Sequence, residues 1–351
     1  MKSGPTIKDI ARAVGVTPAT VSYVLNQNPK QSISAQTRER VMKAAQEMGY
    51  VPSSAAKVVR GSPSYCVGVA IEKDLNTNRF NLVLQGIRDK MEQQGYNLML
   101  CGFERRHGIY ADYVNNALER RVDGVIFIGR DNEGPTLEAE ELILRHQIPF
   151  VVYDCGLEGR PYSTVELEYE KSSFEMTCRL LAEGAKTIFY IRPDLDNYQE
   201  TQREAGVHRA MSLYKNSRLI VERAPITKET MYHPDSNPNQ SEDLYTARRL
   251  WPYVSQRVMP VLEDFTERDA VLLSWGMFIN PVWELLNKVG RRVRLATLSN
   301  VFVSPILRDE VVSCRFLGYA AGAECARLLL KQLDGDRTPE QVLVPMPVGR
   351  E

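Results

Sequence analysis

The sequence predicts a chain in two parts, a small all-α domain (the head) followed by an α/β body with two lobes of doubly wound parallel sheet. Residues 6–26 have the apolar spacing of two short helices joined by a glycine turn. From residue 65 onward, apolar segments that suit buried strands alternate with amphipathic segments that suit helices. This alternation starts again near residue 171, and 351 residues are more than one small domain needs.

The first two helices predict a helix-turn-helix. Thr6 is a good N-cap, and Asp9 three residues later can complete a capping box. Gly15 suits the left-handed turn that ends the first helix, and Thr17 and Pro18 suit the start of the second. In this motif the second helix lies in the major groove of DNA, whereas an ordinary helical hairpin would have no such role.

A third helix and a short proline-led segment complete the head. Ser34 is placed to cap the third helix, which should end at Gly49. Its inward side is expected to contain Val41, Ala44, Ala45 and Met48. We expect a helix-turn-helix domain at residues 1–52 and a hinge helix with linker at 53–63.

Basic residues are concentrated at the N-terminal end of a chain whose net charge is zero. Residues 1–60 contain nine Lys and Arg against three Asp and Glu, a net charge of +6, so the remainder has −6. Neutralisation of phosphates drives DNA affinity, so a basic head on an acidic body is typical of a modular DNA-binding protein. Because the charge coincides with a helix-turn-helix, we favour DNA binding over a merely solvated surface.

Four segments of the head occur in an order that is specific to one family. They are TIKDIARAVGV, ATVSYVLN, TRERVMKAAQEMGYVP and the AAK segment at residues 55–57. This run resembles the N-terminus of the lactose-repressor (LacI/GalR-type) family of bacterial transcription regulators. The resemblance implies a homodimer that binds a near-palindromic operator in double-stranded DNA, and it implies no cofactor.

The resemblance also implies the DNA contacts, residue by residue. Base edges are expected to meet Pro18, Ala19 and Tyr23, although many relatives have arginine where this chain has Tyr23. Phosphates are expected to meet Thr6, Thr17, Thr20, Ser22 and Asn26. Lys8, Arg38, Lys57 and Arg60 should add non-specific affinity. Tyr50 is also expected at the DNA. Segment 53–60 should fold only on the operator, with Ala56 and Val59 near the minor groove.

The body is expected to contain two successive α/β units. The predicted strands are 65–71, 96–103, 122–129, 148–155, 186–193, 218–224, 270–275 and 293–299. The predicted helices are 82–95, 109–121, 136–146, 171–183, 202–214 and 280–290. Two such units suggest two lobes with a ligand cleft between them.

DGVIFIG, REAGVHRAM and GYAAGAECARLLLKQLDG in the body resemble the periplasmic-binding-protein-like core of the same family. The resemblance implies an effector-binding and dimerisation domain at 64–351. Lobe 1 is expected at about 64–158 and 295–320, and lobe 2 at about 162–292 and 321–351. A small-molecule effector of unknown identity should meet Glu72, Arg79, Asp154, Arg203, Trp275 and Asn300.

Three stretches of this expected cleft depart from the sugar- and purine-responsive relatives. Residues 77–80 read Thr-Asn-Arg-Phe where those relatives have Asn-Pro-Phe-Phe. Trp275-Gly276 stands in place of Asn-Asp, and residues 297–300 read Thr-Leu-Ser-Asn in place of Gly-Phe-Asp-Asp. Carboxylates accept paired hydrogen bonds from sugar hydroxyls, so the departures argue against an ordinary monosaccharide effector.

Residues 225–268 form a segment longer than a normal βαβ connection. Its middle is polar and contains prolines, which predicts a surface loop. The part from residue 244 to 265 is expected to be helical with breaks at Pro252 and Pro260. We interpret the segment as a tolerated insertion, with an extra lid or contact surface as the alternative.

The sequence contains no GxSxG elbow, phosphate-binding Walker loop or strand-linked GxGxxG, so we expect no enzyme. Six scattered cysteines without CxxC pairs indicate reduced thiols and no metal site. No long apolar run or apolar leader is present, which predicts a cytoplasmic protein without a membrane partner. The family resemblance implies that it is bacterial and nucleoid-associated. Two alternatives stay open: a DNA-binding regulator whose cleft binds no effector, and an enzyme or solute-binding protein with an appended helical domain.

Overall fold

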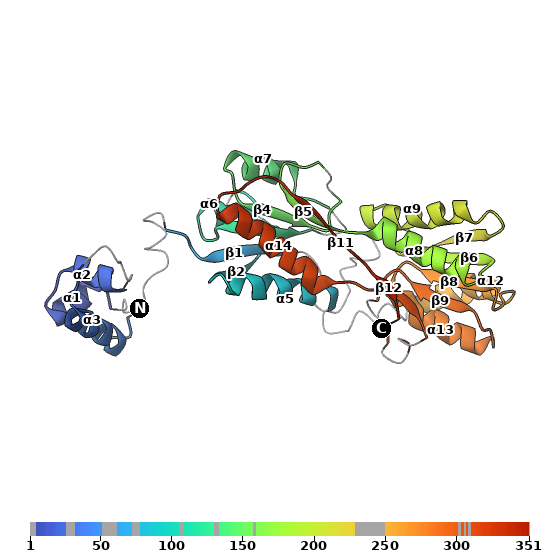
Figure 1. The fold of residues 1–351 in the computed structure, drawn as a ribbon, viewed down its shortest axis with the longest axis horizontal. Helices are drawn as coiled ribbons and strands as arrows, with labels where there is room; N and C mark the ends of the chain where they lie inside the picture. Colours follow the sequence, from blue (N-terminus) through green and yellow to red (C-terminus); the bar gives the residue numbers. More distant parts are fainter. Residues whose placement is uncertain are drawn as a thin grey trace. The chain divides into compact units, whose positions relative to one another are not determined.

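The computed structural model describes residues 5–25, 32–50, 62–71, 78–104, 109–129, 133–156, 159–228, 250–300, 303–304, 307 and 310–350. The chain forms two compact units, Met1–Ser64 and Tyr65–Glu351. The first contains the head and the second is the body (Figure 1). The expected hinge helix at residues 53–60 lies outside the described residues.

The head is a cluster of three helices, α1 (Ile7–Val14), α2 (Pro18–Leu25) and α3 (Ala35–Glu47). The predicted capping box is present: the hydroxyl of Thr6 accepts from the backbone of Asp9, whose carboxylate accepts from the backbone of Thr6. Gly15 has φ +73°, as the predicted left-handed turn requires. The helices share a buried core that consists of Ile10, Ala11, Val14, Val21, Val24, Val41 and Ala45.

One expectation for the head core is wrong. Met48, the residue that caps the C-terminus of α3, is 39% exposed. Tyr50 packs against the core instead, and its backbone N–H returns to the carbonyl of Ala45 at 2.8 Å. Tyr50 therefore closes the end of α3.

The first lobe of the body is built on a six-stranded, entirely parallel sheet in the order β11-β5-β4-β3-β1-β2. The strands are β1 (Cys66–Ile71), β2 (Asn97–Cys101), β3 (Gly124–Ile128), β4 (Phe150–Tyr153), β5 (Ser163–Leu167) and β11 (Gln341–Val344). Alternate strand residues face two helical layers. One layer has α5 (Asn78–Glu92) and α14 (Gly318–Leu333), and the other has α6 (Asp112–Leu118) and α7 (Leu137–Arg145).

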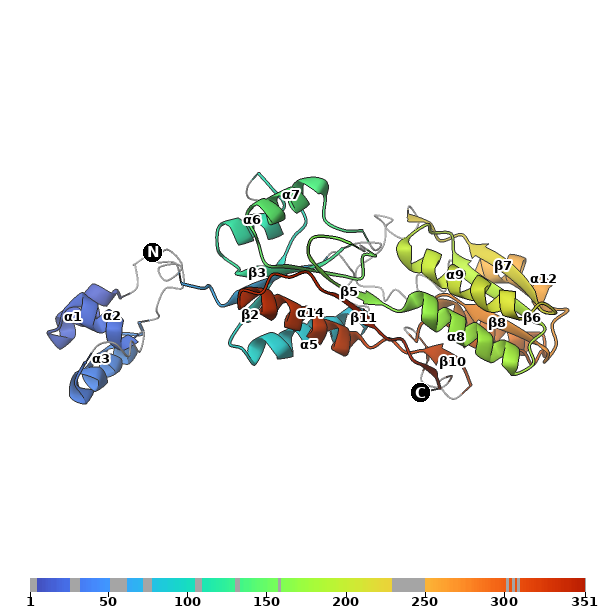
Figure 2. The same ribbon diagram turned by 45° about the horizontal axis from the view of Figure 1, so that its top comes forward.

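The second lobe repeats this plan with the order β12-β10-β9-β8-β6-β7, and its β10–β12 pair is antiparallel. The strands are β6 (Thr187–Pro193), β7 (Arg218–Ala224), β8 (Asp269–Leu273), β9 (Arg294–Thr297), β10 (Val312–Cys314) and β12 (Val348–Gly349). Helices α8 (Tyr169–Ala182) and α9 (Tyr198–Leu213) cover one side of the sheet, as Figure 2 shows. On the other side lie α13 (Ile279–Lys288), the π-helix η2 (Val254–Val258), α12 (Met259–Leu262) and the 3-10 turn η3 (Gly276–Phe278).

The expected division into lobes is wrong at four places. One is β11, which was expected in lobe 2 but pairs with β5 in the first sheet. Strand β5 belongs to the first sheet, although residues from 162 onward were expected in lobe 2. Strands β9 and β10, expected in lobe 1, pair with β8 and with each other in the second sheet. Helix α14, expected mostly in lobe 2, packs on α5 and the first sheet. Strand β9, which follows α13, pairs in parallel with β8, and β10 pairs with β9. The chain therefore returns to the first lobe only after β10.

The long segment 225–268 is only partly the insertion that its composition suggests. Residues 229–249 lie outside the described residues. From Leu250 to Phe265 the chain contributes six buried side chains to the second core, which are Leu250, Tyr253, Val254, Val258, Leu262 and Phe265. The expected break at Pro260 does not occur, because this proline lies in the first turn of α12, where no helical N–H is needed.

Candidate functional site

The head presents the outer side of α2 to solvent. Thr17, Pro18, Ala19 and Tyr23 are exposed, whereas Val21 and Val24 on the same helix are buried. The hydroxyl of Thr17 accepts the backbone N–H of Thr20 at 3.1 Å, so the start of α2 is capped as predicted. The exposed side therefore carries small and polar groups on a helix whose direction is fixed by the core beneath it.

The remaining head residues expected at DNA differ in their roles. Thr20, Ser22 and Arg38 are half-buried. Thr6 is exposed, but its hydroxyl and backbone both bind Asp9, and this hydrogen bonding lowers the pKa of the Asp9 carboxyl. Arg40, which sequence analysis did not single out, donates to the carbonyl of Val14 at 2.6 Å and fixes α3 against α1. Five expected residues lie outside the described residues: Asn26, Ala56, Lys57, Val59 and Arg60.

In the first lobe, Arg79 and Asp154 form an ion pair with little access to water. Their side chains are 13% and 5% exposed. The hydroxyl of Tyr169 accepts from the Arg79 guanidinium at 2.7 Å and donates to an Asp154 carboxylate oxygen at 2.8 Å. Burial works against the charge of Arg79, but Tyr169 and Asp154 facing it raise the pKa of the guanidinium above its ordinary value.

The loop that presents Asp154 is held by a fully buried carboxylate. Glu166 accepts the backbone N–H groups of Cys155 and Gly156 at 3.3 and 3.0 Å. Asp154 itself has φ +54°, a left-handed conformation that aspartate tolerates better than most residues. Non-glycine residues in this region persist only where the surroundings enforce them, and they cluster at functional sites.

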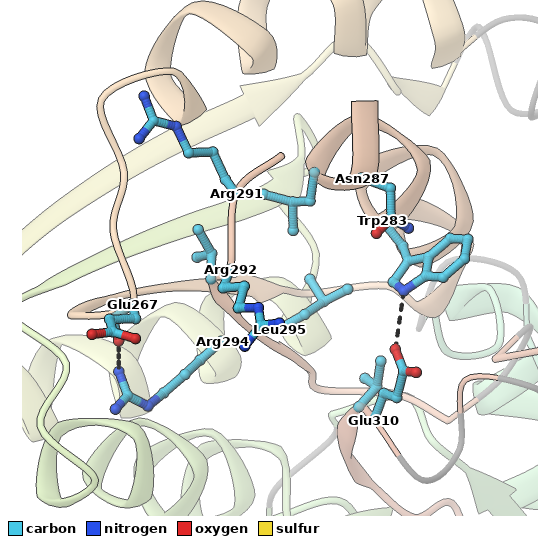
Figure 3. Close-up of a pocket in the computed structure, with 11 residues that line it drawn as sticks. Glu267, Trp283, Asn287, Arg291, Arg292, Arg294, Leu295 and Glu310 are labelled. Atoms are coloured by element: carbon cyan, nitrogen blue, oxygen red, sulfur yellow. Dashed lines mark hydrogen bonds between the residues drawn. The ribbon is translucent and has the colours of Figure 1, made fainter. Parts of the chain in front are cut away.

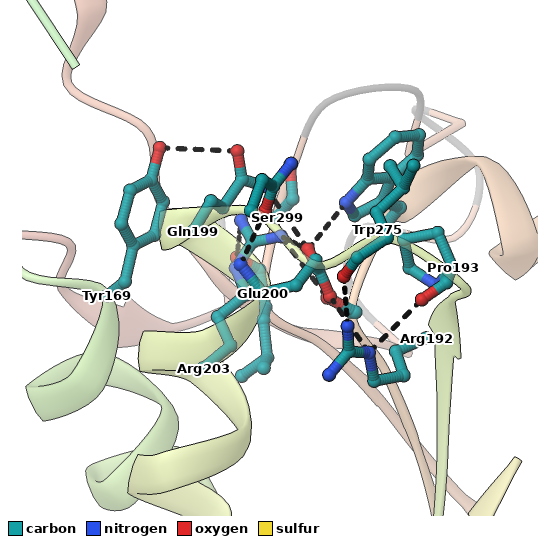
Figure 4. Close-up of polar contacts among 12 residues, drawn as sticks. Tyr169, Arg192, Pro193, Gln199, Glu200, Arg203, Trp275 and Ser299 are labelled. Atoms are coloured by element: carbon teal, nitrogen blue, oxygen red, sulfur yellow. Dashed lines mark hydrogen bonds and ion pairs between the residues drawn. The ribbon is translucent and has the colours of Figure 1, made fainter. Parts of the chain in front are cut away.

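In the second lobe, a buried carboxylate accepts hydrogen bonds from its own helix and from the segment after β8 (Figure 4). Glu200 of α9 accepts from Arg203 at 3.1 Å, from the hydroxyl of Ser274 at 2.6 Å and from the indole of Trp275 at 2.8 Å. Arg203 also donates to Ser274 and to the carbonyl of Leu298, both at 3.2 Å. The charges of Arg203 and Glu200 thus neutralise each other inside the lobe.

A second buried arginine lies behind this group. Arg192 is 1% exposed, pairs with Glu204, and lies 3.8 Å from Glu200. Removing one partner of such a buried pair leaves an uncompensated charge, which costs about 3–5 kcal/mol. These arginines and carboxylates therefore form an interdependent cluster.

The residues expected at an effector site thus separate into three groups. Arg79 and Asp154 lie together in the first lobe, and Arg203 and Trp275 lie together in the second. The side-chain oxygen of Asn300 accepts the backbone N–H of Phe316 at 2.9 Å, so this group fixes the segment that enters α14. Glu72 lies outside the described residues.

Sequence analysis missed Tyr169 and Glu200, although both lie at the centre of the polar contacts. The helix expected at 202–214 begins at Tyr198, because Asn197 caps it by accepting the backbone N–H of Glu200 at 2.9 Å. With that start, Glu200 and Arg203 are one helical turn apart, which is a pairing distance. The asparagine cap was the signal that could have found Glu200.

A separate cavity of about 390 Å³ lies in the second lobe beside the residues that precede β8, β9 and β10 (Figure 3). It is lined in part by Trp283, Arg291 and Arg294. The indole of Trp283 donates to Glu310, Arg291 donates to the carbonyl of Glu263, and Arg294 donates to those of Glu267 and Glu183. These donors serve the fold, so we place the candidate ligand site at the buried charges instead.

The described part of the chain contains neither a metal-binding cluster nor a membrane-spanning helix. There, no three His, Cys, Asp or Glu side chains are grouped so that they could hold a metal ion. Nor does any described helix have the length and apolar character needed to cross a membrane.

Residues 6–53 match the family described as "Bacterial regulatory proteins, lacI family". A similar relative is the HTH-type transcriptional repressor PurR of Vibrio campbellii, with 32% identity over 208 residues, 59% of this chain and 60% of that protein. The match thus spans about three fifths of that relative's length. Catabolite control protein A of Priestia megaterium is 27% identical over 97% of this chain and 96% of its own.

The fold is shared with a solved structure titled as the lac repressor dimer bound to operator and the anti-inducer ONPF. Its TM-score is 0.77 at 20% identity, covering 99% of this chain and 98% of that chain. The predicted fold class, two parallel-sheet lobes that follow a helix-turn-helix head, is confirmed.

Proposed function

Because the chain belongs to the lacI family of bacterial regulatory proteins, we propose that it is a sequence-specific DNA-binding transcriptional regulator, acting as a repressor under the control of a small molecule. The observation that carries this proposal is the capped helix α2, which exposes Thr17, Pro18, Ala19 and Tyr23 on a basic head. A homodimer in the bacterial cytoplasm would place two such helices on a near-palindromic operator. Under this proposal the chain acts by binding DNA and a small molecule and catalyses no reaction.

The same proposal divides the chain into three functional parts: a helix-turn-helix domain at 1–52, a hinge and linker at 53–63, and an effector-binding and dimerisation body at 64–351. The head supplies base and phosphate contacts, and the body supplies the dimer and the ligand response. Reading of bases would come from Pro18, Ala19 and Tyr23, and phosphate contacts from Thr6, Thr17, Thr20, Ser22 and Arg38.

The test for DNA reading is a selection of binding sites from a random duplex library by the full chain, followed by titration of the selected duplex. Ala19→Asp places a carboxylate on the exposed side of α2, where it would repel DNA. We expect its affinity for the selected duplex to fall by about 1–3 kcal/mol, the scale of one lost base-pair contact.

Ala13→Asp is the matched control, since Ala13 is exposed on α1 and the substitution changes the net charge equally. We expect it to weaken binding to selected and unrelated duplexes alike, and only modestly. Equal losses of sequence preference in both variants would contradict the assignment of α2 as the reading helix.

The ligand site is proposed between the lobes, at Arg79, Asp154, Arg203 and Trp275. The contacts of Tyr169 support it, because its hydroxyl binds Arg79 and Asp154 of the first lobe and its ring lies under Arg203 of the second. A ligand that binds only the folded chain raises its melting temperature. A thermal-shift screen with sugars, nucleosides and sugar phosphates therefore tests the proposal, and Arg203→Met should abolish any shift found.

A second candidate is a regulator of the same build that has no effector. It is favoured by one observation: the carboxylates of Asp154 and Glu200 already accept hydrogen bonds from the protein's own side chains. In that case no compound in the screen shifts the melting temperature, while operator binding persists.

A further inference from the structure

Tyr169 lies where the chain passes from one lobe to the other. It comes two residues after β5, a strand of the first sheet, and it is the first residue of α8, a helix of the second lobe. Its side chain is 1% exposed and belongs to the apolar core that includes residues of both sheets. Its position is therefore sensitive to any rotation between the lobes.

The hydroxyl of Tyr169 has its two closest partners in the first lobe and a longer contact, at 3.5 Å, with the side-chain amide of Gln199 on α9. Its ring has a partner in the second lobe. Arg79 of α5 and Asp154 after β4 bind the hydroxyl at 2.7 and 2.8 Å. The guanidinium of Arg203, on α9, lies over the ring with its central carbon 5.0 Å from the centroid. Tyr169 thus joins the ion pair of one lobe to the buried arginine of the other.

Burial makes these contacts expensive to break. The pKa of the Tyr169 hydroxyl lies well above its ordinary value, first because of burial, so the group stays a neutral donor. Arg79 and Asp154 neutralise each other, and the tyrosine hydroxyl is a shared partner of both. Moving the lobes apart would leave these polar groups with one partner fewer in a poorly hydrated place.

Two further contacts bridge the lobes away from the crossing. Tyr198 of α9 packs so closely on Gly156 that a Cβ there would lie 2.2 Å from the ring. Lys228, after β7, forms an ion pair with Glu133, before α7, at 2.5 Å. This pair is exposed to solvent and therefore contributes little, so the buried tyrosine carries the contact.

We propose that Tyr169 is a positioning residue that sets the angle between the two lobes, with Arg79 and Asp154 as its latch. The protein's own side chains then hold the lobes together on this side of the body. The inference goes beyond the proposed function, because it concerns the body alone and would hold whether or not the head reads DNA.

The test measures the distance between the lobes in the full chain. Spin labels on Leu137→Cys and Leu213→Cys report it by pulsed electron resonance, since these leucines are 82% and 64% exposed on α7 and α9. The half-buried Cys66 and Cys178 are first replaced by alanine so that they do not take up the label. The other four cysteines are buried and are kept. The labelled protein is mixed with an excess of unlabelled protein, so that distances between labels on different copies of the chain do not contribute to the signal.

Tyr169→Phe deletes only the hydroxyl. We expect the distribution of distances between the lobes to broaden and its mean to shift, because Arg79 and Asp154 lose their hydrogen bonds to the Tyr169 hydroxyl. Asp154→Asn should act in the same direction, and asparagine tolerates the left-handed backbone of this position.

Tyr153→Phe is the matched control. Tyr153 is also 1% exposed, and its hydroxyl has no hydrogen-bond partner among the described residues. We expect the parental distribution for this variant. A parental distribution in Tyr169→Phe as well, or an equal change in both tyrosine variants, would overturn the proposal.

Titration of the selected duplex with the same variants separates this inference from the proposed function. A changed lobe distance with unchanged duplex affinity supports the latch and counts against control of the head by the body. An unchanged lobe distance removes the latch and leaves the proposal of DNA binding intact.

Discussion

Buried charge governs the candidate ligand site at the scale of single residues. Four charged side chains there are each no more than 13% exposed, and each binds a partner of opposite charge: Arg79, Asp154, Glu200 and Arg203. A ligand that enters here must replace hydrogen bonds that the protein already makes. The affinity of the ligand is then the difference between the contacts that it makes and the protein contacts that it replaces. For this reason the residue types alone do not identify the ligand.

Buried thiols give a pH dependence at the same scale. Burial raises the pKa of Cys314 from 9.0 to about 12, so the folded chain keeps this proton where the unfolded chain releases it. The unfolded state then binds fewer protons, and stability falls as pH rises from about 9 to 12. One such group contributes a slope of about 1.4 kcal/mol per pH unit within this window.

Cys314→Ala should therefore flatten the decline of unfolding free energy between pH 9 and 12, measured by urea titration at several pH values. Leu137→Ala, which changes an exposed side chain that has no proton to release, is the control and should keep the parental slope. An unchanged slope in Cys314→Ala would contradict the assignment of the proton to this thiol.

At the scale of elements, helix pairs in close contact support both lobes. In the first lobe α5 crosses α14 at Gly86, where a Cβ would lie 2.1 Å from the backbone oxygen of Tyr319. In the second lobe α9 meets α8 at Gly206, where a Cβ would lie 2.2 Å from the backbone oxygen of Glu170. Only glycine allows this approach, and the crossing helps to place Arg79 at the start of α5.

Gly86→Ala should destabilise the chain, because backbone atoms of α14 cannot move aside as a flexible side chain would. We expect a loss of about 1–3 kcal/mol in unfolding free energy, the usual cost of overpacking, less the small gain in helix propensity. Gly349→Ala is the control, since nothing lies within 4 Å of a Cβ there. Equal stability of the two variants in urea titration would argue against the close crossing.

Local signals in the sequence predicted most elements but not their assignment to sheets. The caps at Thr6, Thr17 and Ser34 were readable because each depends on residues within one turn. Strand β5 was missed because Ser163, Thr164 and Glu166 make it look polar, although all three are buried. Their partners are distant in sequence, and such pairing is invisible to local patterns.

At the scale of the whole molecule, the chain combines a head that presents one helix with a body whose lobes share polar contacts. The chain passes between the two sheets after β5, after β10 and after β11. Any change in the angle between the lobes must therefore be accommodated by these three connections. If the body regulates the head, effector and operator must alter each other's affinity by the same factor.

The central claim, that paired heads read DNA, is tested most directly by hydroxyl-radical footprinting of the full chain on its selected duplex. We expect two protected regions related by a twofold axis, with centres about one helical turn or a multiple of it apart, because a twofold dimer contacts two half-sites. A single protected region, or uniform protection without sequence dependence, would contradict the claim.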